Sequence, residues 1–328
     1  MKRHLRIVLS SVLAVVLLYI FFRGTNFKAL LVSLKNANPF YLLGFALFLP
    51  LFYFLRAVRW RLLFDKEDRP SIKTFFLANI VGFSINYMLP GRLGEIGRAI
   101  YISRKGKVSS SYSIGTVVVE RFFDAFSVGL LLLFYLLLFP VRSGKLRENL
   151  YTIIFVSFIA VLLLVAGIII MELMIKKGIK APFLFILKLF PERFREKIKN
   201  SAKSLIYGMN FINPPSRAVA FIIWGLIVWI SVVLQYWMGL MAFSVNRPPI
   251  EVIPFTAVLL VGVSIPTPGM AGGFEVASKF FIMEVWHYPQ SVAVAATLTL
   301  HVLLLVVTLS MGAVVGIRES MVVEGGEK

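Results

Sequence analysis

The chain has 328 residues, of which 59% are hydrophobic and 16% are charged, whereas soluble domains carry about 25% charged residues. Its long apolar runs indicate an all-α polytopic membrane protein, and the short alternating segments of a transmembrane β-barrel are missing. The net charge of +19 does not indicate nucleic acid, because the basic residues cluster beside apolar runs, where they attract anionic inner-leaflet lipids. With no cysteine and three scattered histidines, no metal site is expected, and no cofactor is needed.

Continuous apolar runs predict about six membrane spans. They are 6–22, 39–58, 113–139, 151–174, 218–245 and 292–317. Two further apolar segments, 74–103 and 253–286, are interrupted by proline and glycine and predict re-entrant helical hairpins. The basic amino terminus resembles a signal peptide, but no small-residue cleavage site follows, so the first span is expected to stay uncleaved. Segment 182–212 predicts an amphipathic helix on the inner leaflet, with a solvated linker as the alternative.

The distribution of lysine and arginine predicts the orientation. Basic residues cluster at the amino terminus, in 176–217 and after the second span, where they are Arg56, Arg59, Arg61, Lys66, Arg69 and Lys73. All three clusters can face the cytoplasm if segment 74–103 enters and leaves on that side. Both termini are then cytoplasmic, the loops 23–38, 140–149 and 246–252 lie outside, and the protein resides in the cell (cytoplasmic or inner) membrane.

The first interrupted segment breaks within residues 86–98, which read NYMLPGRLGEIGR. Pro90 lacks an amide proton, and Gly91 and Gly94 adopt backbone angles that other residues avoid, so a continuous helix is not expected. Placing charges beside a helix break at membrane depth costs free energy, so such charges indicate a functional site. The alternative is a cytosolic loop between two spans, whose charges lie in water. The polar side chains of this break are candidate substrate-binding residues. They are Asn86, Arg92, Glu95 and Arg98.

The second interrupted segment repeats this pattern. Residues 75–95 and 254–275 share an alanine, a Gly-Phe/Val-Ser-Ile run, a Pro-Gly pair and a glycine followed shortly by glutamate. The charge distribution gives the two hairpins opposite orientations, which is typical of the inverted repeats of secondary transporters. We expect one membrane domain, 1–328, with repeats at 39–139 and 218–317 and a connecting segment, 140–217. The hinge residues of the second break are Pro266, Pro268, Gly269, Gly272 and Gly273, and its candidate binding residue is Glu275.

Charged residues also interrupt span 113–139, as Glu120-Arg121-Phe-Phe-Asp124. Glu120 and Asp124 share a helix face, and Arg121 is spaced to pair with Asp124. Because such charges are costly in lipid, we expect them to face the bundle interior, opposite Arg92 and Arg98, around a cavity that binds a headgroup phosphate. The alternative is a purely structural ion-pair network that pins the helices. Arg98, taken alone, is more typical of an interfacial snorkelling residue.

His301 occupies, in the second repeat, the place that Glu120 and Arg121 occupy in the first. An intramembrane histidine of this kind is a hydrogen-bonded packing residue or a proton relay. Nothing else in the chain matches a catalytic signature: there is no Walker motif, dinucleotide fingerprint, HExxH pair or serine nucleophile elbow. An ATP-driven pump would therefore need a partner chain.

Three motifs occur in order along the chain. They are Asn86-x-x-x-Pro90-x-Arg92-x-Gly94-Glu95-x-x-Arg98, Glu120-Arg121-x-x-Asp124 and Pro266-x-Pro268-Gly269-x-x-Gly272-Gly273-x-Glu275. With these motifs the sequence resembles the flippase-like transmembrane region of lysylphosphatidylglycerol synthases, over about residues 1–320. The resemblance implies a domain that moves a phospholipid between leaflets, often an aminoacylated phosphatidylglycerol. No aminoacyl-transfer domain follows the region, so lysyl transfer from tRNA is not expected.

We therefore expect a lipid translocase for an anionic or aminoacylated phospholipid or a polyprenyl-phosphate-type lipid, rather than an enzyme. One alternative is an integral-membrane enzyme acting on a lipid phosphate, with Glu95 or Asp124 as general base. Another is a scaffold for a lipid- or glycan-modifying partner such as a glycosyltransferase. A homo-oligomer and a lipid-modifying partner enzyme are both compatible with the sequence.

Overall fold

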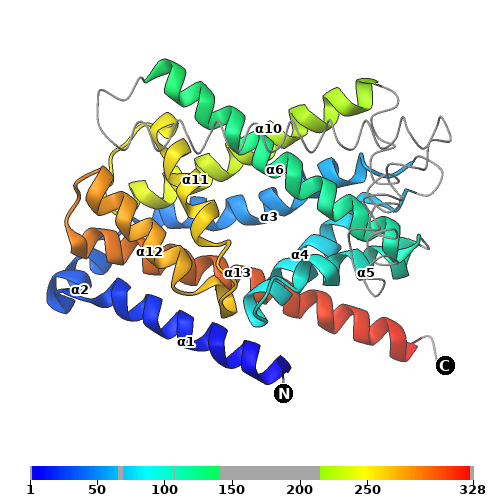
Figure 1. The fold of residues 1–328 in the computed structure, drawn as a ribbon, viewed down its shortest axis with the longest axis horizontal. Helices are drawn as coiled ribbons and strands as arrows, with labels where there is room; N and C mark the ends of the chain where they lie inside the picture. Colours follow the sequence, from blue (N-terminus) through cyan, green and yellow to red (C-terminus); the bar gives the residue numbers. More distant parts are fainter. Residues whose placement is uncertain (1, 66–68, 107, 140–214, 326–328) are drawn as a thin grey trace, which may run out of the picture. The chain divides into compact units, whose positions relative to one another are not determined.

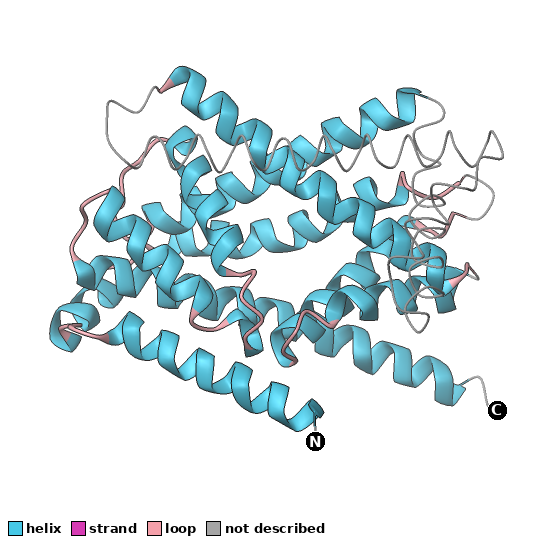
Figure 2. Cartoon of the chain, in the orientation of Figure 1, coloured by secondary structure: helices cyan, strands magenta, loops and turns pink. Residues whose placement is uncertain are grey.

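The structure is a computed structural model that describes residues 2–65, 69–106, 108–139 and 215–325. Over these residues the chain forms helices joined by turns and loops, without a strand (Figure 2). The predicted all-α fold is therefore confirmed. The predicted span 151–174 and the predicted amphipathic helix 182–212 lie outside the described residues.

Helices of membrane-spanning length account for the long apolar runs (Figure 1). Among the described residues, four helices are long and apolar enough to cross a membrane: α3 (Pro39–Arg61), α6 (Ser110–Leu138), α10 (Pro215–Met241) and α13 (Gln290–Gly325). A fifth candidate is the pair α1 (Lys2–Phe22) and α2 (Phe27–Lys35), which is bent by 86° at the break. The chain is a multi-pass membrane protein, and the helices match five of the predicted spans.

Helix α2 corrects one expectation, because its residues were assigned to a loop, 23–38. Asn26 precedes the helix and its side chain accepts hydrogen bonds from the backbone amides of Lys28 and Ala29. These bonds satisfy amides that have no partner inside the helix, so a short segment between two spans that was expected to be a loop forms a helix.

Both interrupted segments form helix pairs around a non-helical break. The first is α4 (Ile72–Met88) followed by α5 (Gly94–Gly106). The second is η2 (Pro249–Glu251) and α11 (Val252–Gly262), the short turn η3 (Pro268–Met270), then α12 (Gly273–Phe280) and η4 (Phe281–Val285). The breaks predicted at Pro90-Gly91 and Pro268-Gly269 are confirmed, and each of the helices beside them is shorter than the about 20 residues of a straight span.

The chain divides into two compact units. Unit 1 comprises Met1–Arg56, Phe76–Arg98 and Ile230–Lys328, and unit 2 comprises Ala57–Phe75 and Ala99–Trp229. Helices α3, α4, α5 and α10 pass from one unit into the other. The predicted repeats, 39–139 and 218–317, each contribute residues to both units, and their inverted relation stays a prediction.

Unit 1 contains both breaks and the carboxy-terminal helix. Within it, α1 packs along α12 and α2 packs on α13. The buried side chain of Gln235 on α10 donates to the carbonyl of Phe45 on α3, and the hydroxyls of Tyr53 and Thr308 lie 2.7 Å apart. Such buried bonds link helices that are distant in sequence, and they fix the frame that carries the two breaks.

Unit 2 is organised around an aromatic cluster at the end of α3. The rings of Trp60, Phe64 and Phe75 pack edge to face, and Phe64 also packs on Tyr112. The indole of Trp60 donates to the hydroxyl of Thr116 on α6 at 2.9 Å. The cluster joins α3, α4 and α6 next to the charged residues of α6.

Candidate functional site

The first break is a sharp turn of left-handed residues. Gly91 has φ 82° and Arg92 has φ 55°, a conformation that is uncommon for a residue with a side chain. The side-chain oxygen of Asn86 accepts a hydrogen bond from the backbone amide of Gly94 at 2.8 Å. Asn86 is thus a capping residue at the start of α5, and it holds the turn closed.

The second break has the same backbone form. Gly269 has φ 63° and Met270 has φ 60°, so in both breaks a Pro-Gly pair is followed by a left-handed residue with a side chain. The carboxylate of Glu275 accepts a hydrogen bond from the amide of Gly272 at 2.7 Å. This contact matches the cap that Asn86 provides in the first break. The two predicted breaks therefore share local geometry as well as sequence.

Glycine pairs let the two arms of each hairpin touch. A methyl group on Gly94 would overlap the carbonyl oxygen of Gly82, and a methyl group on Gly273 would overlap that of Gly262. Only glycine permits backbones to approach this closely, as at tight crossings of membrane helices. The glycines predicted as hinges at 94 and 273 thus have a packing role.

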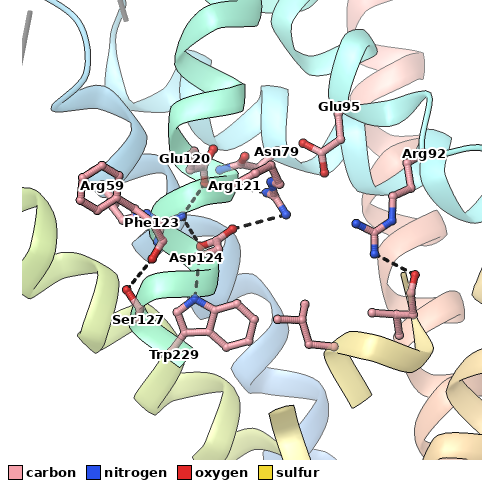
Figure 3. A network of polar contacts seen from close by, with 12 residues as sticks. Arg59, Asn79, Arg92, Glu95, Glu120, Arg121, Phe123, Asp124, Ser127 and Trp229 are labelled. Carbon is pink, nitrogen blue, oxygen red and sulfur yellow. Dashed lines mark hydrogen bonds and ion pairs between the residues drawn. The ribbon is translucent and has the colours of Figure 1, made fainter. Parts of the chain in front are cut away.

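Arg92 joins the two breaks. Its Nη2 donates to the carbonyl of Val263 at 2.8 Å and approaches the hydroxyl of Ser264 at 3.3 Å (Figure 3). Val263 follows the last residue of α11, where unpaired carbonyls carry partial negative charge that a cation stabilises. A Cβ on Gly269 would lie 3.5 Å from the carbonyl of Tyr87. The side chain of the first break therefore caps a helix of the second.

Arg98 is buried, which contradicts its interpretation as a snorkelling residue. Its Nε and Nη2 donate to one carboxylate oxygen of Glu95, at 2.9 and 2.7 Å, and its Nη1 donates to Asn79 at 3.3 Å. Its side chain is 2% exposed, so it does not reach an aqueous interface. Asn79 was missed in the sequence, because an asparagine within an apolar run gives no signal of its partner.

Two arginines assigned to a cytoplasmic loop are also buried. Arg56 and Arg59 lie on α3, which continues to Arg61 instead of ending near residue 58. In unit 1 the guanidinium of Arg56 lies over the rings of Phe52 and Phe83, at 5.4 and 5.5 Å from their centroids. Aromatic faces stabilise such a cation away from water. These two residues therefore cannot count as loop charges.

In unit 2, Arg59 binds both carboxylates of α6. Its Nη2 lies 2.8 Å from Glu120 and 2.6 Å from Asp124, and the indole of Trp229 donates to Asp124 at 3.2 Å (Figure 3). Arg121 pairs with Asp124 at 3.4 Å, as predicted, and its side chain is 31% exposed. Arg59 was not predicted as a site residue. The apolar and aromatic sequence that continues around it to Trp60 could have indicated that it is buried.

Arg92 and Arg98 belong to unit 1, whereas Glu120, Arg121 and Asp124 belong to unit 2. Each group has bonding partners within its own unit. The expectation that these arginines lie opposite Glu120 and Asp124 stays a prediction.

His301 lies at the second break and contacts it on both sides of its ring. Its Nδ1 is 2.6 Å from Glu275, and its Nε2 is 2.9 Å from the carbonyl of Gly269. Both side chains are almost fully buried, at 9% and 5% exposure. Among the described residues, no group of three or more histidine, aspartate or glutamate side chains could hold a metal ion.

Comparison with known proteins agrees with the membrane fold. Residues 7–312 match the family described as the lysylphosphatidylglycerol synthase TM region. The chain is also 28% identical, over 282 residues, to the UPF0104 membrane protein MJ1595 of Methanocaldococcus jannaschii, an alignment that covers 81% of this chain and 80% of that protein. No solved structure matches the chain. The chain thus belongs to the family of lysylphosphatidylglycerol synthase transmembrane regions.

Proposed function

We propose that this protein is a lipid translocase that moves an anionic or aminoacylated phospholipid, or a related lipid phosphate, between the leaflets of the cell membrane. The observation that carries the proposal is the contact of Arg92 with the second break, which joins two Pro-Gly turns of the same backbone form. The headgroup would pass along these breaks while the acyl tails stay in the bilayer. Both termini would face the cytoplasm.

Arg92 suits a phosphate ligand because the groups that it contacts in the second break are neutral. It is half-buried and donates to a neutral carbonyl and a hydroxyl. A phosphate would form charge-assisted bonds with a guanidinium, about twice as strong as bonds between neutral groups. A headgroup could therefore displace the carbonyl of Val263, and this exchange would release the first break from the second.

The shared form of the two breaks supports movement of one repeat against the other. In secondary transporters, substrate binds near the midplane between broken helices of inverted repeats, and rocking of the repeats alternates access. The glycine contacts at Gly94 and Gly273 give each hairpin closely packed arms that would move as one body. In unit 2, Arg121 is the second candidate for phosphate contact, because Arg59 is fully buried between carboxylates.

The test is reconstitution of the purified protein in vesicles with a head-labelled anionic phospholipid. We expect lipid movement between leaflets, at least about tenfold slower for Arg92→Ala if a charge-assisted bond worth about 1.5–3 kcal/mol is lost. Arg104→Ala is the matched control, because Arg104 is exposed on α5. Equal rates for Arg92→Ala and the parent would refute the assigned site.

The same vesicles separate translocation from enzymatic action on a lipid phosphate. The candidate bases are engaged, since Glu95 accepts two bonds from Arg98, and Asp124 accepts bonds from Arg59 and Trp229. We therefore expect the mass spectrum of the lipids to stay unchanged during movement. A new lipid mass that depends on Glu95 or Asp124 would favour the enzyme instead.

A further inference from the structure

We propose that Glu275 and His301 form a proton-binding site that latches the second break, and that opening of this break releases the proton. The latch joins three elements of unit 1, because His301 lies on α13, Glu275 on α12 and Gly269 in the turn η3. The latch itself depends only on these contacts, whereas its link to lipid movement rests on the proposed function.

The hydrogen bonds fix the number of protons. The carbonyl of Gly269 can only accept, so the Nε2 of His301, at 2.9 Å, carries a hydrogen. One oxygen of Glu275 accepts from the amide of Gly272, and the other lies 2.6 Å from Nδ1. A single proton therefore sits between this oxygen and Nδ1. Without it, two lone pairs would face each other at hydrogen-bonding distance.

The proton is thus required for the closed form of the break. Three residues of the turn, Gly269, Met270 and Gly272, have positive φ, so the segment adopts a backbone form that needs bonding partners to persist. The pair supplies them, because His301 holds the carbonyl of Gly269 and Glu275 holds the amide of Gly272. Loss of the proton sets two lone pairs against each other between Nδ1 and Glu275, and so removes the bond that joins α13 to α12 at this turn.

The surroundings of the pair are mostly apolar or aromatic. The ring of Phe274 lies 4.8 Å from that of His301. On the side of α1, Ala14 and Leu17 lie next to Gly272. The titratable groups nearby are Tyr87 on α4, whose ring is 6.1 Å from His301, and Tyr236 on α10, which packs on Phe274. Phenols titrate near pH 10, so neither takes this proton at neutral pH.

The nearest cation on the same helix is directed elsewhere. Lys279 of α12 donates to the backbone carbonyls of Phe21 and Arg23, where α1 ends. Arg92 is bound at Val263 and Ser264 of the same break. The Glu275–His301 contact is therefore the part of the second break that responds to protonation.

The direction of the pH effect follows from the proton count. In water, histidine and glutamate side chains ordinarily have pKa values near 6.5 and 4.3. Between these two pH values the open form keeps the same proton as the closed form, on the histidine. Both forms then bind the same number of protons, so the open population does not depend on pH. Above about pH 6.5 opening releases a proton, and the open population should rise about tenfold per pH unit.

Hydrogen exchange of the break tests the latch without any lipid. We expect the rate of backbone exchange over residues 269–272 to rise above pH 6.5, after correction for the intrinsic pH dependence of exchange. The first break is the internal reference, because Asn86 caps it without a titrating group. Glu275→Gln should abolish the rise, because an amide accepts from Gly272 and donates to Nδ1 without titrating. Thr297→Val is the matched control and should keep it, since Thr297 joins the same two helices through Ser278.

Lipid movement under an imposed pH gradient tests the coupling. The parent and Thr297→Val should move lipid at a rate that depends on the gradient, and Glu275→Gln at a rate that does not. Exchange that stays flat above pH 6.5 in the parent would overturn the latch, and lipid movement indifferent to the gradient would overturn the coupling. If the latch responds to pH while the parent moves no lipid at all, the coupling is overturned together with the proposed function, and the latch stands.

Discussion

Removal of Arg59 should be one of the most damaging single changes in unit 2. Arg59 is fully buried and its Nη2 contacts both Glu120 and Asp124, at 2.8 and 2.6 Å. In Arg59→Met the apolar stem is kept, but both carboxylates lose the cation that contacts them, and the partly exposed Arg121 is 4.0 Å from Glu120. Breaking a buried ion pair on one side costs about 3–5 kcal/mol, and we expect a loss of that size in the free energy of unfolding.

The attribution to charge is tested by a double-mutant cycle in detergent micelles. Combining Arg59→Met with Glu120→Gln removes both partners, so the double variant should be at least about 1 kcal/mol more stable than the sum of the single changes predicts. Arg61→Met on the same helix is the matched control, because its bond to the carbonyl of Pro70 is long, at 3.4 Å. Additivity within about 0.5 kcal/mol would refute the ion-pair reasoning.

Two further predictions concern unit 1. Gly273→Ala should lower the free energy of unfolding by about 1–3 kcal/mol, because the new methyl group overlaps the carbonyl of Gly262. Gly316→Ala is the control and should not lower it, because its methyl group meets open space. Equal thermal stability of the two variants would contradict this packing. Arg98→Lys should cost about 1–3 kcal/mol, because an ammonium cannot reproduce both bonds to Glu95, and a melting temperature equal to that of the parent would show that the pair is dispensable.

The positions of the spans and breaks follow from local sequence, and for that reason they could be predicted. Apolar runs of sufficient length must be helical in lipid, because each backbone group needs a partner within the segment. Pro90-Gly91 and Pro268-Gly269 interrupt this ladder locally, so the breaks required no knowledge of neighbouring helices. The pairing of Arg121 with Asp124 is likewise set by their spacing on one helix.

The partners of the charged residues could not be predicted, because they come from helices distant in sequence. The count of basic residues treats Arg59 as a loop charge, although α3 extends far enough to bury it against Glu120, 61 residues later. Arg98 reads as a snorkelling residue until Asn79 and Glu95 are placed beside it. A residue's hydropathy carries no information about which opposite charge the fold brings to it.

The pair of His301 and Glu275 shows the same limit. The sequence placed a histidine in the last span and a glutamate after the second break, but it gave no contact between them. The structure joins them at 2.6 Å and adds the carbonyl of Gly269, which no motif includes. Backbone carbonyls freed by a helix break become ligands only once the turn is folded.

The most direct test of the central claim is to tie the two breaks together. The chain contains no cysteine, so Met88→Cys and Met270→Cys introduce the only thiols. One thiol follows Tyr87 and the other follows Gly269, and a Cβ on Gly269 would lie 3.5 Å from the carbonyl of Tyr87. A cleavable bis-thiol reagent that bridges them should stop lipid movement in vesicles, and cleavage should restore it, while each single-cysteine variant treated alike keeps moving lipid. Movement by the bridged protein at the unbridged rate would contradict the claim that headgroups cross where these breaks part.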